Sequence, residues 1–330
     1  MKVVIPGGSG HIGTLLGSAL HADGHEVVVL SRRPRRQPWR VVLWDGASVG
    51  AWCEEIDGSD VVINLAGRSV NCRYTPATRR EILQSRVTST AVVGAAIGGA
   101  ARPPRVWLQA STATIYSHRY DGANNERCGV LGGDESNAPS AWRFSIEVAT
   151  AWEHALDQAL TPNTRKVALR SAMTMSPDRG SVFDILLGLV RHGLGGAAGD
   201  GTQFMSWIHD ADFIAAVRWL IDRDHCAGAV NVASPNPLTN REFMRVLRNA
   251  AGVSFGLTAH RWMLEAAAVF LKTEPELILK SRRVVPTRLL ESGFVFCFPT
   301  WPQAAADLYR RWKVQADAPP SMTSHITSAA

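Results

Sequence analysis

A glycine-rich turn near the start of the chain has the residue types and spacing that bind phosphate. Residues 7–13 read Gly-Gly-Ser-Gly-His-Ile-Gly, a G-x-x-G-x-x-G pattern that lies between an apolar run and helix-spaced apolar residues. Glycines permit positive φ, let the backbone approach a pyrophosphate and allow close packing of the next helix. The helix N-terminus then presents free N–H groups to the phosphates. This context favours a dinucleotide site over a simple tight turn, and the predicted site comprises Gly7, Gly8, Ser9, Gly10, His11, Ile12 and Gly13.

The residues after the second apolar run indicate which dinucleotide binds. An NAD site usually places Asp or Glu about 20 residues after the glycine turn, where it holds the ribose 2′-hydroxyl. This chain has Ser31, Arg32 and Arg33 there instead. Guanidinium groups suit a 2′-phosphate, so the sequence predicts NADP as the cofactor. The alternative is that these arginines belong to a solvated loop.

Further candidates follow the ends of later apolar runs. Asp45 comes after the third run, where a carboxylate can accept a hydrogen bond from an adenine amino group. Leu65, Ala66 and Gly67 end the fourth run, where the backbone must pass close to a cofactor. Each of these fits an ordinary turn equally well when taken alone. Their order along the chain is therefore the informative signal.

The elements that must hold these residues alternate between strand and helix. Apolar runs of strand length occupy residues 3–5, 26–30, 41–43, 60–65, 105–110 and 166–170, and helical stretches occupy residues 76–97 and 141–160. This alternation is typical of an α/β fold with a Rossmann-type, doubly wound parallel sheet. Because such folds bind ligands at the carboxyl ends of their strands, we expect the candidate residues to meet at one edge.

Beyond Ser171 the pattern changes to loops and helices. Helices are expected at residues 181–192, from about 210, and at 240–250, 261–271 and 302–312, and a short strand at 229–232 rejoins the sheet. We therefore divide the chain into an NADP-binding domain (1–233, with a lid insertion at about 171–206), a smaller, mostly helical C-terminal lid and substrate domain (234–313) and a disordered tail (314–330).

The order of these motifs resembles that of extended short-chain dehydrogenases/reductases, and more narrowly an atypical branch of the NAD-dependent epimerase/dehydratase-like family that has a C-terminal domain of unknown function. The resemblance covers nearly the whole chain. It depends on residues 7–13, 31–34, 64–67, 85–90, 111–116, 144–153, 199–203, 207–209, 281–286 and 289–294. It implies a Rossmann domain that binds NADP, with Ser111 beside the cofactor, and a lid that shapes a pocket for a small-molecule substrate of unknown identity.

The chain departs from this family at the usual acid–base pair. Thr112 matches the family's hydroxyl residue after the fifth strand, but the Tyr-x-x-x-Lys pair falls on or near Phe144 and Val148. Neither side chain can transfer a proton. Tyr116 is the best substitute because it follows Thr112 at the carboxyl end of the sheet; its alternative role is an aromatic that packs against substrate or nicotinamide. Thr112 and Tyr116 are thus the predicted catalytic residues.

Trp207 and His209 are predicted to contact the substrate from the lid. An imidazole changes charge near physiological pH, so His209 is a candidate titratable group. The alternative is that His209 orders the loop before the next helix through a hydrogen bond. No metal site is expected, because His21 and His25 do not share a helix face and no carboxylate lies near them in a suitable pattern.

Composition restricts the remaining classes of function. The 35 Lys and Arg residues exceed the 29 Asp and Glu residues, yet no basic stripe is interleaved with aromatics, which argues against nucleic-acid binding. Five cysteines without a C-x-x-C pair suit a reducing compartment, and neither a signal peptide nor a membrane span is evident. The sequence therefore predicts a cytoplasmic, NADP-binding, epimerase-like oxidoreductase. The alternative is a non-catalytic NADP-responsive sensor or regulatory binding protein.

Overall fold

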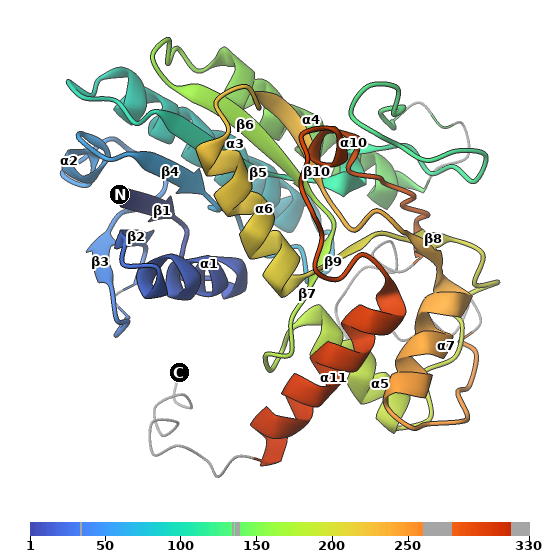
Figure 1. Cartoon of the computed structure of the whole chain (residues 1–330). Helices are drawn as coiled ribbons and strands as arrows, with labels where there is room; N and C mark the ends of the chain where they lie inside the picture. Colours follow the sequence, from blue (N-terminus) through green and yellow to red (C-terminus); the bar gives the residue numbers. More distant parts are fainter. Residues whose placement is uncertain (34, 134, 136–138, 260–278, 318–330) are drawn as a thin grey trace.

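A seven-stranded parallel sheet forms the centre of the protein in a computed structural model that describes residues 1–33, 35–133, 135, 139–259 and 279–317 (Figure 1). The strand order is β10-β6-β5-β4-β1-β2-β3. The strands are β1 (Lys2–Pro6), β2 (Glu26–Ser31), β3 (Arg40–Leu43), β4 (Val61–Asn64), β5 (Val106–Thr112), β6 (Arg165–Ser171) and β10 (Gly228–Val232). All seven predicted strands are confirmed, and so is the α/β fold class.

Helices cover both faces of this sheet (Figure 1). The strands at the centre of the sheet, such as β1 and β4, are buried on both faces, as parallel strands usually are, whereas the edge strand β3 is partly exposed. Val3 and Ile5 of β1 pack on one side with α1 (His11–Ala22) and α6 (Asp210–Asp222), whereas Val4 packs on the other with α2 (Cys53–Ile56), α3 (Pro76–Gly98) and α4 (Ser140–Gln158). The side chains of a strand alternate between its two faces, so one apolar run serves both cores.

A second apolar cluster lies beyond the sheet and joins α5 (Val182–Arg191), α7 (Asn240–Ala250) and α11 (Trp301–Asp317). Thr239 and Glu242 form a capping box that fixes the start of α7. Since α5 comes from the predicted lid insertion, and α7 and α11 come from the predicted C-terminal domain, the two segments share one core.

Two short strand pairs connect this cluster to the sheet, and the sequence did not predict them. β7 (Met173–Met175) pairs in parallel with β9 (Trp207–His209), and β8 (Phe204–Met205) pairs with β11 (Leu238–Thr239) in antiparallel fashion. Strands of two or three residues are too short to produce a readable alternation of apolar and polar residues. A 3-10 turn, η1 (Ala113–Ile115), and a short helix, α10 (Thr287–Glu291), complete the described elements.

The C-terminal boundary differs from the predicted one. Helix α11 continues to Asp317, so residues 314–317 are helical although the sequence placed them in a disordered tail. Trp312, near the end of this helix, donates from Nε1 to Asp184 Oδ1 at 2.7 Å, which anchors its last turns to α5. The helix predicted at 261–271 and the rest of the predicted tail lie outside the described residues. No helix in the described ranges is long and apolar enough to cross a bilayer.

Candidate functional site

The glycine turn lies at the carboxyl end of β1, and its glycines have different roles. Gly7 has a φ of +74°, and a Cβ at this position would lie 2.6 Å from the backbone of Ala66. A Cβ on Gly13 would lie 2.4 Å from the backbone of Gly8. By contrast, a Cβ on Gly10 would meet only the carbonyl oxygen of Gly7, at 3.8 Å. Gly7 and Gly13 therefore allow close packing within the protein, whereas Gly10 leaves open space at the start of α1.

The start of α1 has the properties of an anion site. Gly10 is the N-cap residue and provides no side chain to cap the helix, and the first turn contains no acidic residue. The first N–H groups of a helix have no acceptor within the helix, and they carry a partial positive charge. This open, uncapped helix end fits the pyrophosphate of a dinucleotide.

The two arginines at the end of β2 have no partner among the residues that the structure describes. β2 is the sheet neighbour of β1, and its last residue, Ser31, is buried and accepts a 3.3 Å hydrogen bond from the backbone N–H of Arg33. The side chains of Arg32 and Arg33 are exposed and form no hydrogen bond or ion pair with any described residue. Two unpaired guanidinium groups thus lie beside the glycine turn, as a 2′-phosphate site requires.

Asp45 accepts hydrogen bonds within its own turn. Its carboxylate accepts from the backbone N–H groups of Ala47 (2.8 Å) and Ser48 (2.9 Å) and from the Ser48 hydroxyl. The Ser48 hydroxyl and these backbone groups lower the pKa of Asp45 to about 2. This is the geometry of the ordinary turn that was the alternative interpretation, and the predicted contact with adenine stays a prediction.

The end of β4 is packed tightly below the glycine turn. The backbone N–H of Leu65 donates to Pro6 O at 2.8 Å, and that of Ala66 donates to Asn64 Oδ1 at 3.1 Å. A Cβ on Gly67 would lie 3.2 Å from the guanidinium carbon of Arg86. Small residues are therefore required here by the protein itself, and their contact with a cofactor stays a prediction.

Thr112 ends β5 and is only partly buried. Its Oγ1 accepts a 3.1 Å hydrogen bond from the backbone N–H of Thr114 and thereby caps η1. No hydrogen bond donated by this hydroxyl to a described residue is present, so its proton is available to a ligand. The neighbouring Ser111 Oγ donates to Glu153 Oε1 at 2.5 Å and is committed to that contact.

Tyr116 does not have the geometry expected of a residue that contacts substrate. Its side chain is 2% exposed, and its hydroxyl donates to Asn231 Oδ1 and accepts from Arg170 Nη1, both at 2.9 Å. Burial raises the pKa of Tyr116 despite the nearby Arg170. Arg170 in turn forms a two-bond ion pair with Glu153. The tyrosine hydroxyl therefore belongs to a buried network that joins β6, α4 and β10.

The positions of the missing acid–base pair are apolar and buried. Phe144 is 5% exposed and makes an edge-to-face contact with Tyr74, with ring centroids 5.1 Å apart. Val148 lies in the same small apolar cluster. Neither residue offers a group that moves a proton, as the sequence predicted.

Trp207 and His209 are also buried, so the predicted substrate contacts are not supported. Trp207 is 0% exposed and packs against Trp301. His209 stacks on Phe298 with a centroid distance of 3.8 Å, and its Nδ1 accepts from the backbone N–H of Ala211 at the start of α6. Burial lowers the pKa of His209. The alternative, in which His209 orders the loop before this helix, matches the observed geometry.

The structure places other polar groups near Thr112 that the sequence gave no reason to choose. Lys280, almost fully buried, donates from Nζ to Thr114 O at 2.9 Å, and Arg282 donates from Nε to Thr114 Oγ1 at 3.2 Å. His118 accepts from the backbone N–H of Ser281 at 2.7 Å. Arg282 is only 8% exposed, so its guanidinium lies in the protein interior beside η1.

Two further polar residues were missed at the glycine turn. Ser176 Oγ lies 3.2 Å from His11 Nε2, and Asp178 Oδ2 lies 3.8 Å from His11 Nδ1. Both residues follow β7, a strand that the sequence pattern does not reveal. The one available signal was the Ser-Pro-Asp sequence at residues 176–178, where a loop begins.

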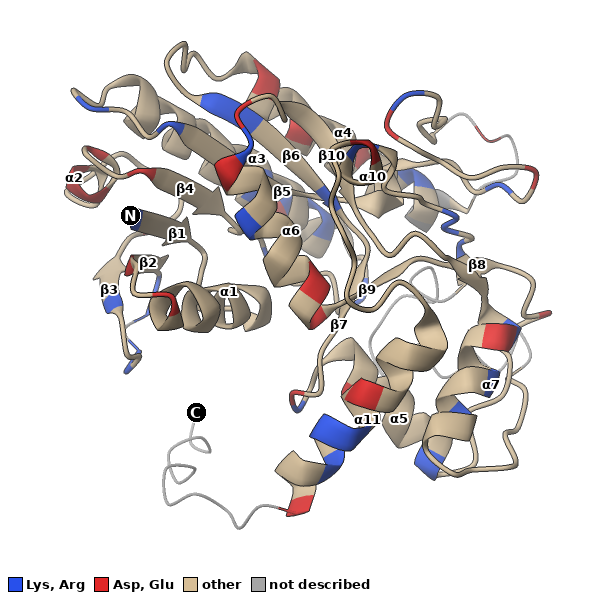
Figure 2. Cartoon of the chain, in the orientation of Figure 1, with Lys and Arg blue, Asp and Glu red and all other residues tan. Residues whose placement is uncertain are grey.

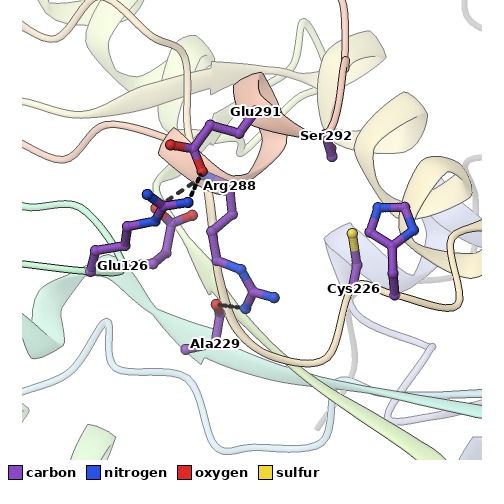
Figure 3. Close-up of a pocket in the computed structure, with 8 residues that line it drawn as sticks. Glu126, Cys226, Ala229, Arg288, Glu291 and Ser292 are labelled. Carbon is purple, nitrogen blue, oxygen red and sulfur yellow. Dashed lines mark hydrogen bonds and ion pairs between the residues drawn. The ribbon is translucent and has the colours of Figure 1, made fainter.

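A cavity of about 470 Å³ lies elsewhere, beside the sheet's edge strand β10 (Figure 3). Its charged groups already bond within the protein, since Arg127 pairs with Glu291 and Arg288 donates to Ala227 O and Ala229 O. Glu126 accepts from the backbone N–H of Asn231. These side chains cover the edge of the sheet that β10 leaves open. The residues just before β10 lie at the amino end of this strand, and the glycine turn lies at the opposite, carboxyl end of the sheet.

A parallel sheet of this order with an open glycine turn at its carboxyl edge defines a dinucleotide-binding protein of the Rossmann type. The family model described as "NAD dependent epimerase/dehydratase family" matches residues 3–233, and a domain of unknown function (DUF1731) matches residues 261–308. The chain therefore belongs to the NAD-dependent epimerase/dehydratase family, as the motifs indicated.

Relatives match over nearly their full length. The human epimerase family protein SDR39U1 is 31% identical over 304 residues, which cover 91% of this chain and 96% of the relative. YfhF of Bacillus subtilis is 30% identical over 302 residues, with 90% and 94% covered. The crystal structure of human SDR39U1 (isoform 2) with NADPH has a TM-score of 0.82 at 28% identity and covers 94% of this chain and 99% of that one.

Proposed function

We propose that this protein binds NADP(H) and catalyses hydride transfer between the nicotinamide and a carbonyl or alcohol substrate held at Thr112. The observation that carries the proposal is the pair of exposed guanidinium groups of Arg32 and Arg33 at the end of β2, which bond to no residue in the described part of the chain. The relative crystallised with NADPH supports this choice of cofactor. The proposed substrate is a small molecule.

The residues of the chain have distinct tasks in this proposal. The N-terminus of α1 binds the pyrophosphate, and Arg32 and Arg33 bind the 2′-phosphate. The bound nicotinamide supplies or accepts the hydride. Thr112 Oγ1 accepts from the Thr114 N–H, which leaves its own proton free to hydrogen-bond a substrate oxygen. Phe144 and Val148 stand where the family usually has its Tyr-x-x-x-Lys pair. These positions therefore cannot supply the general acid–base catalysis that usually accelerates the reaction about a hundredfold to ten-thousandfold.

A comparison of NADPH with NADH tests the cofactor assignment. A charged hydrogen bond contributes about 1.5–3 kcal/mol, so Arg32→Ala and Arg33→Ala should each weaken NADPH binding roughly tenfold to a hundredfold while leaving NADH binding unchanged. Fluorescence titration measures both affinities. Arg127→Ala, which removes an exposed guanidinium near the opposite edge strand β10, is the control. Equal affinities for the two nucleotides in the wild-type protein would refute the assignment.

A regulatory protein that binds NADP without turnover is the second candidate. The buried Phe144 and Val148, and the fully bonded hydroxyl of Tyr116, are the observations that favour it. Oxidation of NADPH, followed at 340 nm with a panel of carbonyl compounds, separates the two functions. Turnover that Thr112→Ala abolishes supports the oxidoreductase, whereas tight binding without turnover on any compound supports the sensor.

A further inference from the structure

A polar bridge links the start of α1 to the loop between β7 and α5. His11 is the first residue of α1, and its Nε2 lies 3.2 Å from Ser176 Oγ. Ser176 Oγ donates to Asp178 Oδ2 at 2.7 Å. The second carboxylate contact is looser, with 3.8 Å between His11 Nδ1 and Asp178 Oδ2. The three side chains thus span the space between the glycine turn and the helical cluster.

The hydrogen-bond roles in this bridge follow from the number of available protons. A serine hydroxyl has one hydrogen, and Ser176 uses it on Asp178. Ser176 Oγ must therefore accept from His11 Nε2–H, and it also accepts from the backbone N–H of Asp178 at 3.2 Å. Ser176 is fully buried, so it holds the carboxylate and the imidazole in fixed positions.

The loop that contains Asp178 is itself well anchored. Ser181 Oγ donates to Ser176 O at 2.7 Å, and the backbone N–H of Ser181 donates to Asp178 O at 3.1 Å. Ser181 also caps α5 by accepting from the backbone N–H of Asp184. Because α5 packs into the cluster with α7 and α11, the position of Asp178 is set by the whole helical part of the molecule.

This placement has an electrostatic consequence for the cofactor. The side chain of Asp178 is 46% exposed and stands against the first residue of α1. The same helix end is the proposed site of the pyrophosphate, which is negatively charged. Like charges at short range repel, and partial exposure reduces this repulsion without removing it.

We propose that the charge of Asp178 weakens cofactor binding by repelling the pyrophosphate, and that Ser176 and His11 are the positioning residues that hold this carboxylate in place. The inference rests on the proposed function, because it requires a dinucleotide at the glycine turn. It differs from the roles of Arg32 and Arg33, since a pyrophosphate is common to NADH and NADPH. Asp178 therefore controls affinity for both nucleotides and does not discriminate between them.

Titration of NADPH and NADH with Asp178→Asn tests the proposal. The amide keeps an acceptor for the Ser176 hydroxyl but removes the charge, so both nucleotides should bind about threefold to tenfold more tightly at about 50 mM salt. The gain should shrink at about 500 mM salt, because ions screen charge repulsion. A purely structural role would not produce this salt dependence. Asp224→Asn, an exposed carboxylate removed at a remote position, is the matched control and should change neither affinity.

Ser176→Ala provides a second variant, which keeps the Asp178 carboxylate but removes the serine hydroxyl that holds it in place. Asp178 can then turn toward solvent, and both nucleotides should bind more tightly, by less than in Asp178→Asn. Thermal unfolding without nucleotide verifies that each variant is folded. If the wild-type protein binds both nucleotides but Asp178→Asn binds them with unchanged or weaker affinity, this inference is overturned and the proposed function stands. Failure of the wild-type protein to bind either nucleotide overturns the proposed function and the inference together.

Discussion

The hydroxyl of Tyr116 illustrates how burial removes a side chain from chemistry. A phenol transfers protons readily only when its pKa approaches the working pH and when it reaches the substrate. In this protein burial raises the pKa of Tyr116, and both hydrogen bonds of the hydroxyl are made to the side chains of Arg170 and Asn231. The tyrosine therefore contributes to the stability of the sheet edge.

Tyr116→Phe should consequently affect stability more than function. The substitution leaves the buried Arg170 donor and the Asn231 acceptor without their partner, at a cost of about 1–3 kcal/mol in the free energy of unfolding. NADPH affinity should stay within about twofold. Urea denaturation and NADPH titration measure the two effects. Tyr309→Phe, on the last helix, is the control; loss of turnover in Tyr116→Phe at unchanged stability would contradict the structural role.

His209 should make stability depend on pH. Burial lowers the pKa of His209 in the folded protein, whereas an unfolded imidazole titrates near pH 6.5. The unfolded state therefore binds the proton first, so stability is fully present above about pH 6.5 and decreases as the pH falls below it. His118, whose pKa burial also lowers, contributes in the same direction.

The measurement is the free energy of unfolding between pH 5 and pH 8. His209→Asn should flatten the decrease below pH 6.5, because asparagine does not titrate and can still cap α6. The exposed His225→Asn should retain the wild-type slope. A pH profile of His209→Asn that parallels the wild-type profile would show that the histidine is not held neutral.

At the scale of elements, the glycines in the turn between β1 and α1 have two different roles: Gly13 is needed for folding, and Gly10 for ligand binding. Gly13→Ala forces a Cβ against the Gly8 backbone, so it should destabilise the protein by several kcal/mol or prevent folding. Gly10→Ala meets open space and should cost at most about 1 kcal/mol. It should nevertheless weaken NADPH binding at least tenfold, because the new methyl group occupies the approach to the helix start. Thermal unfolding and nucleotide titration distinguish the two; normal NADPH affinity in Gly10→Ala would exclude the pyrophosphate from this place.

The sequence predicted the sheet well because each of its strands carries a local signal. Apolar runs such as residues 27–30 are buried on both faces and can be recognised without knowledge of their neighbours. The helical part of the molecule is different, because Trp207 and His209 acquire their burial from Trp301, Phe298 and Asp307. These partners lie about ninety residues later in the chain, and spacing within one segment cannot reveal them. The contact between Asp178 and His11 could not be predicted for the same reason, because it joins residues far apart in the sequence and depends on the path of β7.

At the scale of the whole molecule, α11 binds the two parts of the protein together. Arg311 forms a two-bond ion pair with Asp210 of α6, Trp312 donates to Asp184 of α5, and Trp301 Nε1 donates to Phe243 O of α7. Basic and acidic residues lie along the same helix (Figure 2). This one helix therefore contacts α6, which packs on the sheet, as well as α5 and α7 of the helical cluster, and its loss should loosen both parts.

Two adjacent arginines on α11 allow this coupling to be measured. Asp210 is 3% exposed at its side chain, so Arg311→Met leaves a buried carboxylate without its cation, which typically costs about 3–5 kcal/mol and less here because Arg311 is partly exposed. Arg310, 69% exposed, pairs with Asp307 at the surface, and Arg310→Met should cost at most about 1 kcal/mol. Chemical denaturation followed by tryptophan fluorescence and by bound NADPH should give coincident transitions in both variants. An Arg311→Met protein that loses only the fluorescence transition, while the nucleotide site unfolds at the wild-type midpoint, would show that the two parts fold independently.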